Sequence, residues 1–245
     1  MAIPGFAASA LPALTTDQMR EVDRSMIEDF AISLEQMMEN AGRGLAELAR
    51  FELGSVQGQT IVVLAGSGSN GGGGMAAARH LANWGARVQV TQSKEPDPGK
   101  STARQQLEIL RRMGIPIVDA TSARGLAGAA LYLDALIGYG LQDAPRGAAA
   151  ALIRLANESG RPIIALDTPS GLDTTSGEIM NPCMRARWTL TLALPKTGLL
   201  QPSARSVVGE LFLADISVPP ELYSRMGLAV PHIFAESALV RIDRA

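Results

Sequence analysis

Six short apolar runs constrain the fold of this 245-residue chain more than any other feature of its sequence. Four of them contain β-branched side chains, a polar or glycine-rich loop follows most of them, and helical stretches separate several of them. This alternation predicts βαβ units, because parallel neighbouring strands need a crossover connection long enough to hold a helix. The runs are residues 60–65, 88–91, 131–136, 163–167, 188–193 and 211–214.

Two helices are predicted before the first of these strands. Thr15 with Gln18, and Ser33 with Gln36, have the spacing of a capping box, and apolar residues at helical intervals follow each pair. Further helices are expected over residues 75–84, 102–113 and 148–157. The sequence therefore predicts an α/β protein with a doubly wound, mostly parallel sheet and helices on both of its faces.

The domain organisation is predicted to be simple. Because the chain contains no internal repeat or low-complexity linker, we expect residues 15–245 to form a single domain. Residues 1–14 are small and apolar, but two prolines and a glycine interrupt them and they lack a basic start. We interpret this segment as a flexible N-terminal arm and not as a signal peptide.

The amino-acid composition limits the binding partners and the cellular compartment that are expected for this protein. The formal net charge is −2, no basic run is present and only 4% of residues are aromatic, so nucleic acid is not an expected partner. No apolar stretch approaches the roughly 20 residues needed to cross a bilayer, so no membrane association is expected. The single cysteine, Cys183, excludes an intramolecular disulfide and fits the reducing cytoplasm. A small-molecule ligand is the remaining expectation.

A glycine-rich loop, Gly66–Gly74, follows the first predicted strand and contains the pattern G-x-G-x-x-G. Backbone N–H groups in such a loop can approach phosphate oxygens at a helix N-terminus. An ordinary NAD(P)-dependent oxidoreductase also needs an acid at the end of the second strand, where this chain has Gln92 and Ser93, with Glu95 as the first candidate. That alternative is therefore disfavoured, and a tight turn without ligand contact is the other alternative.

Two aspartates, Asp134 and Asp167, end strongly apolar strands, where a side chain can point into the mouth of a cleft. Each could instead cap a turn. A cluster of Asn70, Asp134 and Ser170 would offer only oxygen ligands, which suits a hard cation such as potassium and not zinc or copper.

The remaining reactive side chains are interpreted as structural. His80 lies inside a predicted helix and His232 lies near the C-terminus, so neither pairs with a nucleophile. Ser170 is not in the G-x-S-x-G turn of a serine hydrolase. Lys196 is interpreted as a solvated loop lysine, with a phosphate contact as the alternative. Cys183 has no evident activating group.

Five motifs, taken in order, resemble those of the NAD(P)H-hydrate epimerases, the YjeF N-terminal-domain family. The resemblance spans about Leu14 to Ser217. It implies a Rossmann-like three-layer domain, often a homodimer, that interconverts the R and S forms of hydrated NADH and NADPH and binds a potassium ion. Members of the family are often fused to an ATP- or ADP-dependent hydrate dehydratase. The motifs are Met38–Gly42, Gly66–Gly74, Asp134–Gly138, Asp167–Asp173 and Leu194–Gly198.

The resemblance also implies positions for the site. Its potassium ligands fall on Asn70, Asp134 and Ser170, and its cleft aspartate falls on Asp167, which we expect to act as the general acid and base. Its two ligand-binding stretches fall on Ser69, Asn70, Gly71, Gly72 and Gly73, and on Gly138, Tyr139, Gly140, Leu141, Gln142, Asp143 and Ala144.

Three positions depart from the family pattern. Its glycine loop usually reads Gly-Asn-Asn-Gly-Gly-Asp-Gly, whereas this chain has Ser69 in place of the first asparagine and Gly73 in place of the aspartate. Gln142 replaces a lysine that the family usually carries. A non-catalytic nucleotide-binding or scaffold module on the same fold is therefore the alternative to an active epimerase.

Overall fold

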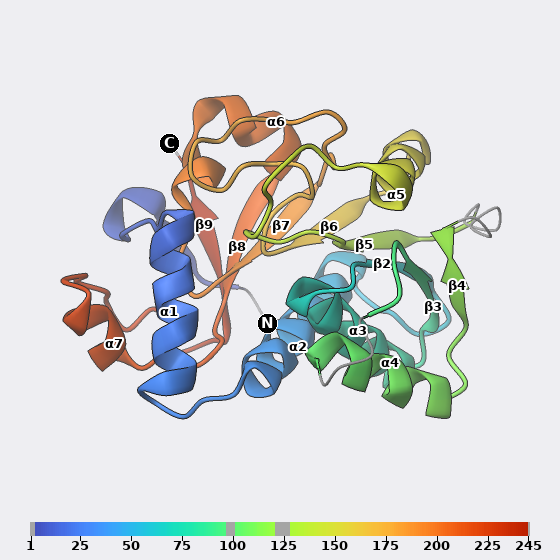
Figure 1. Ribbon diagram of the computed structural model, residues 1–245, viewed down its shortest axis with the longest axis horizontal. Helices are drawn as coiled ribbons and strands as arrows, with labels where there is room; N and C mark the ends of the chain where they lie inside the picture. The colour runs from blue at the N-terminus through green and yellow to red at the C-terminus, as the bar shows by residue number, and fades with distance from the viewer. Residues whose placement is uncertain (1–2, 97–100, 121–127, 245) are drawn as a thin grey trace.

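A nine-stranded sheet forms the centre of the computed structural model, which describes residues 3–96, 101–120 and 128–244 (Figure 1). The strand order is β1-β9-β8-β7-β6-β5-β2-β3-β4, and within the described residues every neighbouring pair is parallel except β8 with β9. The strands are β1 (Gly5–Ala7), β2 (Thr60–Ala65), β3 (Arg87–Gln92), β4 (Ile117–Asp119), β5 (Leu131–Ala135), β6 (Ile163–Leu166), β7 (Trp188–Leu192), β8 (Glu210–Ala214) and β9 (Leu239–Asp243).

Helices cover both faces of this sheet. Figure 1 shows α3 and α4 on one side of the sheet and α5 on the other. The doubly wound, three-layer α/β architecture predicted from the sequence is therefore confirmed. The helices are α1 (Thr16–Glu28), α2 (Leu34–Leu53), α3 (Ser69–Asn83), α4 (Thr102–Arg112), α5 (Gly147–Glu158), α6 (Arg205–Val208) and α7 (Pro220–Arg225), with short 3-10 helices at Ala8–Ala10, Thr197–Leu200 and Pro202–Ala204.

Alternation along the central strands divides the apolar interior between the two faces. In β2, Ile61 and Val63 pack in the larger core, which includes residues of α2, α3 and α4. Val62 and Leu64 point the other way, into the smaller core beneath α5. A strand buried on both faces reads as a continuous apolar run, and this explains why the six runs were recognisable as strands.

Both predicted capping boxes are present. The Thr15 and Ser33 side chains accept hydrogen bonds from the backbone N–H groups of Gln18 and Gln36, and each glutamine side chain accepts one from the backbone N–H of its capping residue. These bonds satisfy N–H groups at the helix start that have no partner within the helix. They fix the first residues of α1 and α2.

The N-terminal segment differs from the prediction of a flexible arm. Gly5–Ala7 forms β1, which pairs in parallel with β9 at the edge of the sheet. Leu14 is fully buried, and its backbone bonds to both Pro195 and Thr197, at 2.8 and 2.9 Å. The strand β1 is only three residues long, and its partner lies at the opposite end of the chain, so no local pattern could indicate the pairing.

The glycine-rich segment also differs from the prediction, because α3 begins at Ser69 and not near Met75. Its glycines are helical, and they allow close packing. A Cβ atom at Gly74 would lie 2.3 Å from the Cβ of Ala135 in β5. A Cβ at Gly42 in α2 would lie 2.5 Å from that of Ala76 and 2.6 Å from the carbonyl oxygen of Gly73. The low helix propensity of glycine is overridden here by packing.

A further result concerns membranes. In the parts of the chain that the structure describes, no helix combines the length and the apolar character needed to span a bilayer.

We expect Gly42→Ala to lower the free energy of unfolding by about 1–3 kcal/mol, because the added methyl group forces α2 and α3 apart. Chemical denaturation of the purified protein measures this loss. Arg43→Ala is the matched control, since Arg43 is an exposed neighbour whose side chain forms a surface ion pair with Glu47. Equal stability of the two variants would contradict the close approach of the helices.

Candidate functional site

A cleft of about 480 Å³ lies at the carboxyl ends of β2, β5 and β6. The chain runs outward from β2 through β3 to β4 and then returns to place β5 on the other side of β2, so the strand order reverses between β2 and β5. Ligands of open α/β sheets bind at such a reversal. The cleft is lined by residues from α1 and α2, the start of α3, the segment 136–140, Gln142, Asp167, Leu192 and Ile216.

Only some residues of the two ligand-binding stretches implied by the resemblance line the cleft. Ser69 and Asn70 line the cleft, whereas Gly71, Gly72 and Gly73 lie buried in the first turns of α3. In the second stretch, the residues that line the cleft are Gly138, Tyr139, Gly140 and Gln142. The remaining members, Leu141, Asp143 and Ala144, are not part of the lining.

Asp167 follows β6 directly, and its side chain reaches the cleft. Its backbone has a φ of 68°, in the left-handed region that non-glycine residues rarely adopt. Its carboxylate accepts a hydrogen bond from the backbone N–H of Tyr139, at 2.8 Å, and another from the ammonium group of Lys196, at 2.6 Å. Strained backbone of this kind clusters at functional sites, where the surrounding structure holds it in place.

The interpretation of Lys196 as a solvated loop lysine was wrong. Its side chain is fully buried, and its ammonium group donates to Asp167, to the hydroxyl of Thr191 and to the carbonyl oxygen of Leu192, at 2.6, 3.1 and 2.8 Å. Three acceptors satisfy the three N–H donors of the ammonium group. Leu14 pairs with Lys196 through an isolated parallel bridge, so the N-terminal segment holds the backbone that carries this lysine.

Asp23, which sequence reasoning did not single out, reaches the same cleft from α1. The hydroxyl of Tyr139 donates a hydrogen bond to its carboxylate. Burial raises the pKa of Asp23, and burial followed by the negative charge of Asp23 raises the pKa of Tyr139. Tyr139 therefore contacts two aspartates, Asp23 through its hydroxyl and Asp167 through its backbone N–H.

Asp134 and Ser170 form a buried pair beside the cleft. Ser170 donates to the Asp134 carboxylate from its hydroxyl, at 2.7 Å, and from its backbone N–H, at 2.8 Å. The backbone N–H of Leu136 donates to the same carboxylate at 3.2 Å. Burial raises the pKa of Asp134 to about 6, against the effect of these hydrogen bonds. Within the described structure, the hydrogen bonds to this carboxylate come from neutral groups, and no cationic side chain contacts it.

Asn70 lies near this pair and near Asp167. A Cβ placed on Gly138 would meet Asp167 at 3.0 Å and Asn70 at 3.2 Å, so both side chains border the same glycine. The amide nitrogen of Asn70 is buried and has no hydrogen-bond partner in the described structure. A buried donor without a partner costs about 1–3 kcal/mol, and an oxygen atom of a bound ligand would satisfy it.

The residues present fit a monovalent cation. The predicted ligands Asn70, Asp134 and Ser170 supply only oxygen donors and a single carboxylate charge. A cation beside Asp134 would balance the charge that burial disfavours. The described residues contain no group of three or more His, Cys, Asp or Glu side chains able to hold a metal ion.

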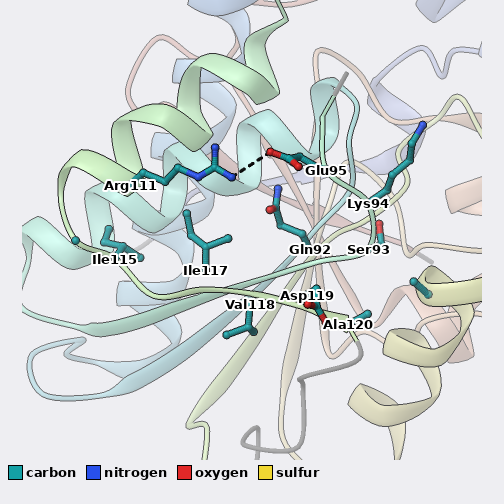
Figure 2. A pocket seen from close by; sticks show the side chains of 12 residues that line it. Gln92, Ser93, Lys94, Glu95, Arg111, Ile115, Ile117, Val118, Asp119 and Ala120 are labelled. Carbon is teal, nitrogen blue, oxygen red and sulfur yellow. Dashed lines mark hydrogen bonds and ion pairs between the residues drawn. The ribbon is translucent and has the colours of Figure 1, made fainter. Parts of the chain in front are cut away.

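A larger cavity, of about 560 Å³, lies at the ends of β3 and β4 (Figure 2). None of the predicted site residues lines it, so size alone does not identify the functional site. Glu95, the candidate for a ribose-binding acid, is ion-paired with Arg111 at 3.1 Å, as Figure 2 shows, and with Arg104 at 3.5 Å. This pairing leaves the dehydrogenase interpretation without its usual carboxylate.

The other reactive side chains stand outside the cleft. His80 is hydrogen-bonded at 2.9 Å to Glu39, which also pairs with Arg79. His232 is exposed and lines a different cavity. Burial raises the pKa of the Cys183 thiol to about 12, so this thiol is protonated at neutral pH and is not activated.

Comparison with known proteins gives consistent results. The model of the family described as YjeF-related protein N-terminus matches residues 34–198. An NAD(P)H-hydrate epimerase from Dehalogenimonas lykanthroporepellens is 46% identical over 220 residues, which cover 89% of this chain and 87% of that protein. A bifunctional NAD(P)H-hydrate repair enzyme from Moorella thermoacetica is 37% identical, and the match covers 85% of this chain but 41% of the enzyme.

A solved structure supports the fold independently. The crystal structure of yeast ynu0 superposes with a TM-score of 0.82 at 20% identity, and the match covers 95% of this chain and all of the yeast chain. At that identity the likeness bears on the fold alone.

We expect Lys196→Met to lower the free energy of unfolding by about 3–5 kcal/mol, because it leaves the buried Asp167 carboxylate without its positive partner. The double variant with Asp167→Asn should recover part of the loss, since it removes the uncompensated charge. Denaturant unfolding of the single and double variants measures both effects. Arg112→Ala, which breaks an exposed ion pair, is the control and should cost less than about 1 kcal/mol. A Lys196→Met loss no larger than that of the control would contradict a buried ion pair.

Proposed function

Because this chain belongs to the family of YjeF-related protein N-termini, we propose that it is an NAD(P)H-hydrate epimerase, which interconverts the R and S forms of hydrated NADH and NADPH. The observation that carries this proposal is the buried Asp167–Lys196 pair, which places a carboxylate in a cleft beside the glycine-rich start of α3. A carboxylate in that position can transfer protons, and the helix start can bind phosphate.

The start of α3 suits the diphosphate of the substrate. Gly68 caps this 15-residue helix without a side-chain hydrogen bond, so the first N–H groups remain for a ligand. The helix dipole adds a partial positive charge at this end. The unpartnered amide nitrogen of Asn70 supplies a further donor. The nicotinamide end would then lie toward Asp167, within the lining of the same cleft.

The reaction inverts C6 of the hydrated nicotinamide ring, which bears a hydroxyl group and is bonded to the ring nitrogen N1. The C6–O bond breaks as the N1 lone pair forms an N1=C6 double bond, and the hydroxyl leaves as water after gaining a proton. Water then adds to the opposite face of C6 and loses a proton, while the N1 lone pair is restored. Asp167 can exchange such a proton with the substrate oxygen. Its ion pair with Lys196 holds a negative charge at this carboxylate in the resting site.

Potassium is part of the proposal, as the family resemblance implies. Asn70, Asp134 and Ser170 would hold the ion, which would supply positive charge near the cleft. Asp134 joins the end of β5 to Ser170 in the loop after β6, so this position lies beside the segment that carries Gly138 and Tyr139. These residues organise the loops, and the proton transfers belong to other groups.

A linked enzyme, an oligomeric state and a cellular location are also part of the proposal. Bifunctional relatives join this domain to a further repair activity, so a functional link to an ATP- or ADP-dependent hydrate dehydratase is part of the proposal. A homodimer is proposed from the family resemblance, and a cytoplasmic location is proposed from the single cysteine. Sedimentation of the purified protein tests the dimer.

We expect the purified protein to convert the R hydrate of NADH into the S form well above the spontaneous rate, and Asp167→Asn to lower kcat by about 10²-fold or more. Chromatography that separates the two hydrates measures the conversion. Glu178→Gln, an exposed acid of the same loop region, is the control. No acceleration by a folded protein that still binds nucleotide would favour the non-catalytic module. The structure offers one observation against that alternative: Gly73 lies beneath Leu166 and Met38 and is not part of the cleft lining.

We expect epimerisation to be faster in potassium buffer than in a potassium-free buffer of equal ionic strength, and Asp134→Asn to remove this difference. A cation that binds only the folded state also raises the unfolding free energy, by about 2.7 kcal/mol at a concentration 100 times its Kd. Thermal unfolding in the two buffers therefore gives a readout that does not depend on turnover. Equal rates and equal unfolding temperatures for the unaltered protein would rule out the ion.

A further inference from the structure

We propose that Asp23 of α1 is a second proton-transfer residue of the epimerase, which works with Asp167 and is oriented by the hydroxyl of Tyr139. This inference rests on the proposed function and adds to it a catalytic residue outside the motifs that carry the family resemblance. Three observations support it: the contacts around Tyr139, the chemical requirement of inversion, and the different surroundings of the two carboxylates.

The contacts place the two aspartates around one tyrosine. Tyr139 donates from its hydroxyl to Oδ2 of Asp23 and from its backbone N–H to Oδ2 of Asp167, and all three residues line the cleft. Asp23 makes no other hydrogen bond in the described structure. Its second oxygen, Oδ1, is thus left without a protein partner, and a bound substrate can take that place.

Inversion at C6 requires two proton transfers to and from oxygen. The leaving hydroxyl must gain a proton, and the water that enters on the opposite face must lose one. A protonated carboxyl group and an ionised carboxylate present at the same time meet both needs. In one direction Asp23 gives its proton to the leaving hydroxyl and Asp167 takes the proton of the entering water. This leaves Asp23 ionised and Asp167 protonated, and exchange of protons with solvent water restores the starting state before the next turnover. The reverse reaction uses the two residues in exchanged roles, so the substrate and product differ only in configuration and no net proton is consumed.

The surroundings of the two carboxylates indicate which one acts as the acid and which one acts as the base. Asp167 is ion-paired with Lys196, which favours a negative charge there. Among the described residues, none forms an ion pair with Asp23. Burial is the largest effect on its pKa and raises it, the nearby charge of Asp167 raises it further, and Tyr139 and Lys196 lower it. Arg20, one turn earlier on α1, lines the same cleft and completes the charged groups around the pair. Burial thus favours the protonated form of Asp23, whereas Asp167 has a cationic partner in contact with its carboxylate.

Tyr139 itself is a poor candidate for the acid. Burial and the charge of Asp23 raise the pKa of its hydroxyl, so it gives up its proton less readily than an ordinary tyrosine. Its hydrogen bond instead fixes the Asp23 carboxyl group and stabilises the ionised form that Asp23 takes after donating its proton. Tyr139 is thus a positioning residue, and Asp23 is the catalytic one.

The first test replaces Asp23 by Asn, which can still accept the hydrogen bond of Tyr139 but cannot carry the proton. We expect kcat for epimerisation to fall by about 10²- to 10⁴-fold, the usual contribution of a general acid, with a much smaller change in KM. Asp23→Glu should recover part of the rate. Glu28→Gln, an exposed acid of the same helix, is the matched control and should retain full activity. Unfolding curves of all variants establish that they are folded.

The second test is Tyr139→Phe, which keeps the backbone N–H to Asp167 and removes only the hydroxyl. Because Asp23 must be protonated to act, kcat falls as pH rises through its pKa. The hydrogen bond from the Tyr139 hydroxyl stabilises the ionised form of Asp23. Removing this bond therefore raises the pKa of Asp23. The alkaline limb of the pH profile should therefore move to higher pH. A merely structural role for Tyr139 would leave the limb in place, and this test also decides the matter if Asp23→Asn does not fold.

The outcomes separate the inference from the function on which it rests. If the unaltered protein does not epimerise the hydrates, the proposed function fails and this inference falls with it. If the unaltered protein is active and a folded Asp23→Asn variant keeps its kcat, only the role of Asp23 is overturned. An alkaline limb that stays in place or moves to lower pH in Tyr139→Phe overturns it as well.

Discussion

The buried ion pair between Lys196 and Asp167 connects the ends of β6 and β7 with the segment after β5 at the cleft. Lys196 also binds the end of β7, and Asp167 also binds the backbone of Tyr139, so one charge pair joins the ends of two strands to the segment after a third. A buried ion pair is weak evidence for stability, because removal of the charges from water opposes their attraction. Its position in the cleft and the strained φ of Asp167 point instead to a role in holding a reactive carboxylate in place.

The sequence predicted the central strands and the chemistry of their ends because both are local properties. Residues 60–65 and 131–136 read as strands since nearly every side chain is buried, and Asp134 and Asp167 follow such runs directly. Asp23 and Lys196 could not be predicted in this way. Asp23 meets Tyr139 across 116 positions of the chain, and Lys196 bonds to Asp167 across 29 positions. Neither residue differs, by local pattern, from an exposed charged residue.

The glycine-rich segment illustrates a different limit of prediction from sequence. Its pattern predicted a loop that approaches phosphate, and helix propensity placed the following helix at residues 75–84. The structure begins the helix at Ser69, because its glycines allow α2 and β5 to come closer than any side chain would permit. The same glycines therefore serve packing inside the domain, and only Gly68, Ser69 and Asn70 face the cleft. A sequence motif cannot separate these two uses.

The bridge between Leu14 and Lys196 has a practical consequence for work with this protein. The first 14 residues look dispensable, yet Leu14 is fully buried, and its backbone is hydrogen-bonded to the residues on either side of Lys196. A shortened chain that lacks them would lose these backbone bonds, and we expect water to reach the ion pair more easily as a result. Water weakens the attraction between charges many-fold relative to a protein interior. Such a chain could fold, bind nucleotide and still misreport the rate of the intact protein.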